Sequence, residues 1–309
     1  MLEIFLRTLP FFALIGLGWG AGRTGFFPAV ATEWLTRFVF YFALSAMLFR
    51  FAATLPITGI FDLPFVLAYL TGCFAIYGLA FAVALARRLK IEEAAMEAQC
   101  AIIGNTGFLG VPLLVALLGP QAAGPVLMCL VVDLIVFSSL ITLIVTASRE
   151  RQVGAAIIRS LLGGLAKNPM IVSMLAGMIW SLFTPTLPRP VDDFLTILGA
   201  AATPGALFAI GASLSGRSAD RPAAALWLSL CKLVLHPAAV AFAALRLYPV
   251  EPFAAGVMIA AAALPVAGNV YILASHYGIA PRRVSASILI STAASILTVP
   301  LVVAWITNA

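Results

Sequence analysis

Two apolar stretches of the sequence contain the residues best suited to hold a ligand. AQCAIIGNTGFLGVPLLVALL covers residues 98–118, and IAAAALPVAGNVYILA covers residues 259–274. Each stretch has a Gly-Asn pair, at Asn105 and at Asn269, together with a proline. Proline removes a backbone donor and glycine lowers the cost of unwinding, so both stretches predict a helix that breaks.

A broken helix inside an apolar stretch provides the groups that bind an anion. The unwound backbone and the N-terminus of the next half-helix present N–H groups, which favour a carboxylate. An Asn amide can donate to a substrate oxygen or accept from a cation. The alternative is that the glycines are packing notches and the asparagines hold helices together, but a matched pair beside proline favours a binding site. The predicted substrate-binding residues are Gly104, Asn105, Thr106, Gly107, Pro112, Pro265, Gly268 and Asn269.

Three ionisable residues, Asp133, Lys232 and His236, also fall inside apolar segments. Such residues are expensive in lipid and are candidates for ion coupling. Asp133 and Lys232 could neutralise each other, either as part of a proton or sodium relay or as a structural ion pair. His236 shares a helix face with Lys232, and a packing role is favoured for it. Arg50 is expected to be an interfacial anchor, or to attract anions.

Other functional classes find little support. The sequence has no HExxH or GxSxG motif and only 2 His, which argues against an enzyme and against a metal site. The net charge of +6 comes from residues in short loops that form no continuous basic face, which argues against nucleic acid as a partner. We therefore predict no catalytic residue, metal or cofactor, while coupling to protons or sodium stays open.

The elements that must position these residues are membrane-spanning helices. Hydrophobic residues make up 63% of the chain and charged residues 10%, against roughly 25% charged in a soluble domain. A span needs roughly 20 apolar residues. The runs that satisfy this predict an all-α polytopic membrane protein with ten transmembrane helices, at 3–21, 34–54, 63–86, 94–118, 124–147, 169–187, 193–215, 223–246, 253–276 and 284–307.

The ten spans divide into two repeats. Asp62 and Pro64 correspond to Asp220 and Pro222 at an offset of 158 residues, and Gly104-Asn105 corresponds to Gly268-Asn269 at an offset of 164. Five spans per repeat force the second unit to enter the membrane from the opposite side, as in many secondary transporters. The predicted domains are residues 1–147, a first five-helix repeat, residues 148–168, a cytoplasmic amphipathic linker, and residues 169–309, a second five-helix repeat.

Orientation follows from the basic residues of the loops. Odd-numbered loops carry 12 Lys and Arg and even-numbered loops carry 3. Because cytoplasmic loops are the more basic ones, the odd loops are predicted to be cytoplasmic and both termini to face outward.

Four motifs resemble those of the auxin efflux carrier family, in particular its bacterial branch of malonate and malate permeases. They are GNTGFLGVPLL, AATPGALFAIGASL, KLVLHP and ALPVAGNVYILA. The resemblance implies a ten-span carrier of the bacterial inner membrane, with a scaffold part and a transport part. It also implies Pro-broken helices 4 and 9 that cross beside an organic anion. The long central cytoplasmic loop of the plant members is absent here.

The expected function is therefore secondary active transport of a small mono- or dicarboxylate by alternating access. The expected partners are this anion and membrane lipid, with a homodimer through the scaffold helices left open. A sodium-coupled bile-acid-type symporter or a cation/proton antiporter of the same inverted-repeat architecture is the alternative. Those carriers place several acidic residues at the crossing, whereas only Asp133 is available here.

Overall fold

The computed structural model describes residues 2–54, 62–149, 163, 166–184, 186–216 and 222–308, and nearly all of them are helical. Most of the expected linker 148–168 and the expected repeat match at Asp220 lie outside the described residues. The helices are α1 (Leu2–Arg23), α2 (Ala29–Phe38), η1 (Val39–Ala43), α3 (Leu44–Thr54), α4 (Leu63–Ala86), α5 (Ile91–Ile102), η3 (Thr106–Gly110), α6 (Val111–Leu118), η4 (Pro120–Ala122), α7 (Ala123–Val132), η5 (Asp133–Phe137), α8 (Ser138–Arg149), α10 (Pro169–Phe183), α11 (Arg189–Ala200), α12 (Ala202–Leu214), α13 (Pro222–Leu230), η6 (Cys231–Leu235), α14 (His236–Phe242), η7 (Ala243–Leu247), α15 (Pro252–Ala262), α16 (Gly268–Tyr277) and α17 (Pro281–Asn308).

Seven helical segments of the described chain are long and apolar enough to cross a bilayer. They are Phe5–Arg23, Ala29–Thr54, Leu63–Ala86, Pro120–Ser148, Arg189–Leu214, Ala223–Leu247 and Pro281–Thr307. The chain is therefore an all-α polytopic membrane protein. Each of the other three expected spans contains a shorter apolar helix, at Thr106–Leu118, Pro169–Phe183 and Pro252–Ala262.

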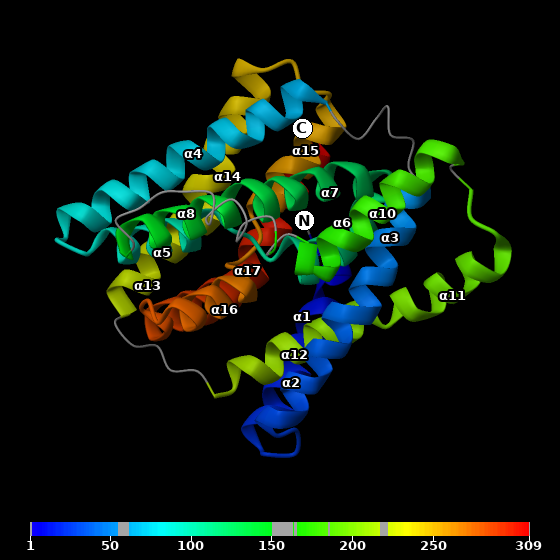
Figure 1. Cartoon of the computed structure of the whole chain (residues 1–309), viewed down its shortest axis with the longest axis horizontal. Coiled ribbons are helices and arrows are strands. Elements are labelled where there is room, and N and C mark those ends of the chain that lie inside the picture. Colours follow the sequence, from blue (N-terminus) through cyan, green and yellow to red (C-terminus); the bar gives the residue numbers. More distant parts are fainter. Residues whose placement is uncertain are drawn as a thin grey trace.

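The helices pack as two groups; in Figure 1 α4, α5, α8 and α13 lie toward the left, and α2, α3, α11 and α12 lie toward the bottom and right. The first group contains α1, α2, α3, α10, α11 and α12, with α1 against α12 and α3 against α10. Small residues bring these backbones together. A Cβ atom added at Gly211 of α12 would collide with the carbonyl oxygen of Ile15 in α1, and one added at Gly18 of α1 would collide with that of Phe208 in α12.

The second group contains α4 to α8 and α13 to α17. In it α4 packs on α5 and α14, α13 packs on α17, and α15 packs on α7 and α14. Ionic contacts tie three of its helices together at one end. Glu97 of α5, which is 2% exposed, accepts from Arg87 Nη1 at 2.8 Å and from Arg283 Nη1 of α17 at 2.7 Å.

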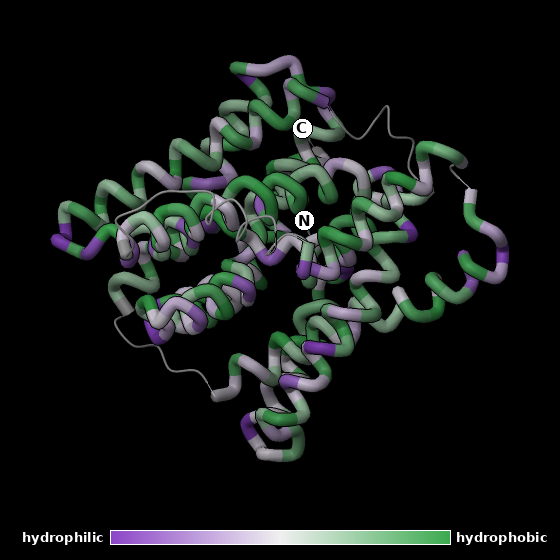
Figure 2. Tube along the Cα trace, viewed as in Figure 1, coloured by the Kyte–Doolittle hydropathy of each residue, from purple (hydrophilic) through white to green (hydrophobic). Residues whose placement is uncertain are grey.

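The outer surface of both groups is apolar. Figure 2 shows hydrophobic residues along the helices, and a hydrophilic turn between α4 and α5. Large side chains such as Phe183, Ile197 and Leu182 are more than half exposed. A soluble protein would bury side chains of this kind, and in a bilayer they contact lipid instead.

We predict that Gly211→Ala lowers the free energy of unfolding by about 1–3 kcal/mol, because the added methyl group meets backbone atoms that can move only with their helix. The matched control is Gly20→Ala in α1, where a Cβ atom has nothing within 4 Å. That change should leave stability equal or slightly higher, because alanine is the better helix former. Thermal melting of the detergent-purified variants measures both. Equal melting temperatures would show that the α1–α12 contact tolerates separation.

Candidate functional site

The two stretches with Gly-Asn pairs lose their helical structure and pair with each other. α5 ends at Ile102 and α15 ends at Ala262, and helix resumes at Thr106 and at Gly268. Between these ends an isolated antiparallel bridge joins Gly104 to Val266. The backbone N–H of Asn105 donates to the Pro265 carbonyl at 2.8 Å, and the backbone N–H of Ala267 donates to the Ile103 carbonyl at 3.1 Å. Each interrupted segment therefore satisfies backbone groups of the other.

Two helices begin at this bridge. η3 and α6 follow Asn105 without interruption, and α16 follows Ala267. The first N–H groups of a helix have no intrahelical acceptor and carry partial positive charge. Hence both half-helices direct positive ends toward the same bridge.

The two asparagines lie at these N-termini with unused hydrogen-bonding capacity. Asn105 is 7% exposed and precedes η3, and its side chain makes no N-cap hydrogen bond to that helix. Asn269 is the second residue of α16. Its Oδ1 atom is buried and has no hydrogen-bond partner among the described residues. An orphaned buried acceptor is uncommon in a native structure and calls for a partner, such as a ligand.

Lys232 and His236 converge on the end of α15. The Lys232 Nζ atom donates to the Ala262 carbonyl, and His236 Nδ1 lies 3.2 Å from the same oxygen. Lys232 Nζ also lies 3.2 Å from His236 Nδ1. A cation at a helix C-terminus compensates the negative end of the helix dipole and satisfies a carbonyl that has lost its amide. Lys232 is therefore a cap for α15 as well as a buried charge.

Asp133 contacts the other interrupted segment. The Tyr69 hydroxyl of α4 donates to Asp133 Oδ1 at 3.0 Å. The Thr106 hydroxyl lies 3.5 Å from Asp133 Oδ2 and 3.4 Å from the Gly104 carbonyl, so it can donate to either. Asp133 is 3% exposed and opens the π-helical turn η5, a feature that often marks functional sites.

Asp133 and Lys232 flank the same short segment, residues 104–106, without touching each other. Within the part of the chain that the structure describes, no ion pair joins them. A Cβ atom at Gly104 would lie 3.3 Å from Lys232 Nζ, and Thr106, two residues later, contacts Asp133. Lys232 thus lies beside the first residue of this segment and Asp133 beside the last. The predicted mutual neutralisation of the two charges does not occur through a direct contact.

The remaining predicted residues take different positions. Gly107 lies against the Met170 side chain of α10, at the boundary with the first group. Pro112 follows the π-helical turn η3 within the helix that runs from Thr106 to Leu118, so it lies beyond the break. Gly268 is exposed, and a Cβ atom there would meet nothing within 4 Å. The end of α16 at Gly268 is therefore the accessible side of the crossing.

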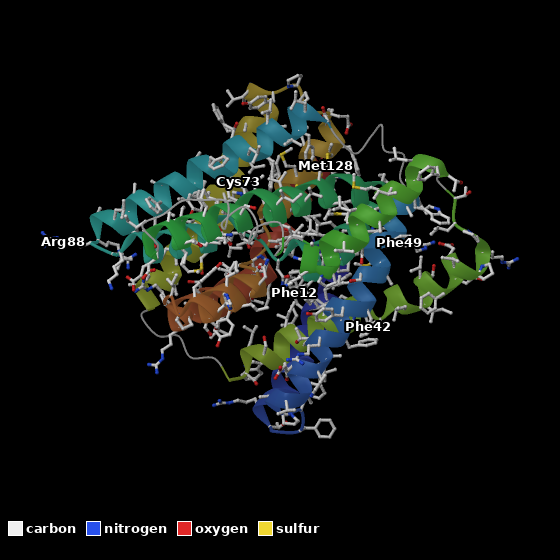
Figure 3. The ribbon with its side chains drawn as sticks, viewed as in Figure 1. Phe12, Phe42, Phe49, Cys73, Arg88 and Met128 are labelled. Carbon is white, nitrogen blue, oxygen red and sulfur yellow. The ribbon has the colours of Figure 1, made fainter. Side chains whose placement is uncertain are left out.

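Three further residues contact the side chains or backbone of the crossing, and nothing in the sequence marks them as functional: Tyr69, Cys73 and Ser291. Tyr69 and Cys73 lie one turn apart on α4, and Figure 3 shows Cys73 about halfway along that helix. Cys73 Sγ lies 3.2 Å from His236 Nε2, which leaves both ring nitrogens of His236 in contact with protein. The Ser291 hydroxyl of α17 accepts from the Val266 amide at 3.0 Å. An isolated Tyr, Cys or Ser in an apolar run is too common to be identified from the sequence.

Arg50 has a structural partner that its place in the sequence does not indicate. Its Nε atom lies 2.6 Å from Asp192 Oδ1 and its Nη2 atom lies 3.3 Å from Asp192 Oδ2. This bidentate geometry joins α3 to α11 within the first group. Arg50 is therefore not a lone interfacial anchor.

We predict that the double variant with Asp133→Asn and Lys232→Met loses less stability than the sum of the losses in the two single variants. Each single change leaves one buried charge without its opposite across the break, and the double change leaves neither; because no contact joins the two groups, we expect a coupling below the ~3–5 kcal/mol of a directly paired buried charge. The measurement is a double-mutant cycle on thermal stability in detergent. Tyr77→Phe is a control, because it removes a buried hydroxyl without a partner in the described chain. Additive losses would show that the two charges do not interact.

Comparisons with known proteins agree with a membrane carrier. Residues 3–303 match the family described as membrane transport protein. A "Putative malonate transporter" of Rhizobium meliloti (strain 1021) is 32% identical over 302 residues, which cover 97% of this chain and 94% of that protein. An uncharacterised transporter of Methanocaldococcus jannaschii is 25% identical over 221 residues, 69% of each chain. Since the family match spans nearly the whole sequence, the chain belongs to the membrane transport proteins of the auxin efflux carrier family and is a transporter, not an enzyme.

Proposed function

We propose that the protein is a secondary active transporter of a small organic anion, a mono- or dicarboxylate such as malonate or malate, bound where the two broken helices cross. The observation that carries this proposal is the convergence of two helix N-termini on one hydrogen-bonded bridge, with Asn105 and Asn269 beside them. Such half-helix ends are suited to carboxylate groups.

The charge balance around the bridge favours an anion as substrate. Lys232 is fully buried beside Gly104, and the carboxylate that faces the bridge in the described chain, Asp133, is engaged by Tyr69 and placed to accept from Thr106. A substrate that brings its own negative charge would meet one ammonium group and two helix N-termini. The similarity to a protein named as a malonate transporter supports the same substrate class.

The inverted repeat of ten spans is the architecture that we propose for this transporter. If the first and second spans correspond to the sixth and seventh, two packing contacts become equivalent. The contact of α1 (first span) with α12 (seventh span) then matches the contact of α10 (sixth span) with α3 (second span). The same correspondence relates the break after α5 to the break after α15. Alternating access would then move the second group against the first, with the crossing carried in the second group. A homodimer would use the exposed apolar face of the first group.

A sodium-coupled symporter or a cation/proton antiporter is the second candidate. The observation that favours it is the Asn269 Oδ1 atom, an acceptor that a cation could satisfy as well as a substrate hydroxyl. Asp133 could supply a charge nearby.

We predict that Asn105→Ala and Asn269→Ala each weaken malonate binding at least tenfold while leaving the melting temperature of the protein within a few degrees. The loss of one hydrogen bond to a charged ligand is worth about 1.5–3 kcal/mol, which corresponds to such a change in affinity. Calorimetric titration of purified protein measures it. Gln121→Ala, which removes an exposed amide outside the crossing, is the control. Wild-type affinity in either Asn variant would make that residue structural.

Asn269→Asp separates the two candidate functions, because it preserves the shape of the side chain and adds a negative charge. An anion site should lose malonate binding, whereas a cation site should retain or strengthen its response to sodium. Thermal shifts with malonate and with sodium chloride, read against potassium chloride, measure both responses.

We also predict that both termini face the outside of a bacterial inner membrane, from the loop charge asymmetry. The four native cysteines, Cys73, Cys100, Cys129 and Cys231, are buried, so an introduced cysteine can be labelled with little background. Pro249→Cys should react with an impermeant maleimide in intact cells. Thr24→Cys should react only after the membrane is permeabilised. The reverse pattern would invert the orientation.

A further inference from the structure

An apolar groove lies outside the crossing, between the span that carries Lys232 and the last helix. Its volume is about 520 Å³, within the range of small-molecule sites of about 300–1,000 Å³. The groove has one polar side chain in its lining, that of Thr298. Its walls are Leu233, Val234, Pro237, Ala238 and Ala241 of η6 and α14, Ile259 of α15, and Thr298, Leu301, Val302 and Trp305 of α17.

The groove exists because two helix stripes face each other with unequal side chains. Residues 298, 301, 302 and 305 form one stripe of α17 at helical spacing. The opposite wall of α14 presents Pro237, Ala238 and Ala241, which are too short to fill the space. α17 packs along α13, whereas α14 packs on α4 and α15. The space between the two stripes is therefore left unfilled by side chains of the described chain.

The direction of the groove identifies the kind of molecule. α17 has 28 residues, and Trp305 stands near its C-terminal end, where aromatic residues mark the membrane interface. Thr298 lies seven residues earlier, about 10 Å deeper along the helix. The groove therefore runs from the interface toward the middle of the bilayer, in the direction of a lipid chain. Val234, Leu301 and Trp305 are each about half exposed, which leaves the groove open to the surrounding lipid.

We propose that this groove binds one acyl chain of a membrane phospholipid, from the leaflet at the C-terminal end of α17. The chain lies against the outer side of the segment whose inner side carries Lys232 and His236, since the groove residues Val234 and Ala238 follow those two by two positions and so lie on the opposite side of the helix. A bound lipid thereby supports the helix wall behind the crossing. This site is separate from the proposed substrate site and does not depend on it.

The test is fluorescence quenching of Trp305 by a phospholipid with brominated acyl chains. The protein retains Trp305 and carries phenylalanine at positions 19, 34, 180 and 227, and it is held in a detergent that does not quench. Titration of the brominated lipid should give quenching that saturates at about one lipid per chain. Quenching that rises linearly without saturation would mean that lipid contacts only the open surface and would overturn the proposal.

Matched variants locate the lipid in the groove. Ala238→Phe, and independently Ala241→Phe, should abolish saturable quenching, because each places a ring in the groove. Ala75→Phe on the exposed face of α4 is the control and should leave quenching unchanged. Having two groove variants guards against one that fails to fold. Equal quenching in all folded variants would exclude the groove as the binding site.

Two further readouts exclude other occupants. Thr298 Oγ1 is buried without a partner among the described residues, so Thr298→Val should maintain or strengthen binding of a chain that offers no hydrogen bond. A loss of binding in this variant would instead indicate a polar ligand. Native mass spectrometry should show one retained phospholipid and an oligomeric state that Ala238→Phe does not change. A dimer that this variant dissociates would assign the groove to a second copy of the chain.

Discussion

The structure depends on two backbone hydrogen bonds, between residues 103 and 267 and between residues 105 and 265. A helix that breaks in hydrocarbon exposes amide and carbonyl groups that lipid cannot satisfy, at several kcal/mol each. Here each broken segment supplies hydrogen-bond partners for the other. The two breaks are therefore stable only where they lie side by side. This pairing places η3 and α16 with their N-termini together, and the proposed anion site is a consequence of it.

The buried charges of the second group follow from the same constraint. The bridge leaves the Ala262 carbonyl at the end of α15 without a helical donor, and Lys232 supplies one. A buried ammonium group is expensive without compensation, and Asp133 provides an opposite charge on the other side of the break, oriented by Tyr69. An anion that enters between them would change this balance. The residues that stabilise the break are therefore also placed to respond to substrate.

The sequence predicts the breaks but not their surroundings. Gly104, Asn105, Pro265 and Asn269 stand out because glycine, proline and amide residues are unusual in the middle of an apolar run. Their meeting, by contrast, is a tertiary contact, and neither Tyr69 nor Ser291 differs from the many hydroxyls that bond to their own helix. Pro112 lies outside the pairing of the two breaks. A proline in an apolar run indicates a break, but this one follows the π-helical turn η3 inside a helix that continues from Thr106 to Leu118.

The two helix groups differ in what holds them together, and this difference bears on transport. In the first group glycines bring α1 and α12 into backbone contact, and the Arg50–Asp192 pair joins α3 to α11. In the second group Glu97 binds Arg87, which caps the C-terminus of α4, and Arg283 of α17. By contrast, at one boundary between the groups Gly107 meets the flexible side chain of Met170. Rigid contacts within each group and an adaptable one between them suit the proposed alternating access, in which the bridge would stay intact while its exposure changes.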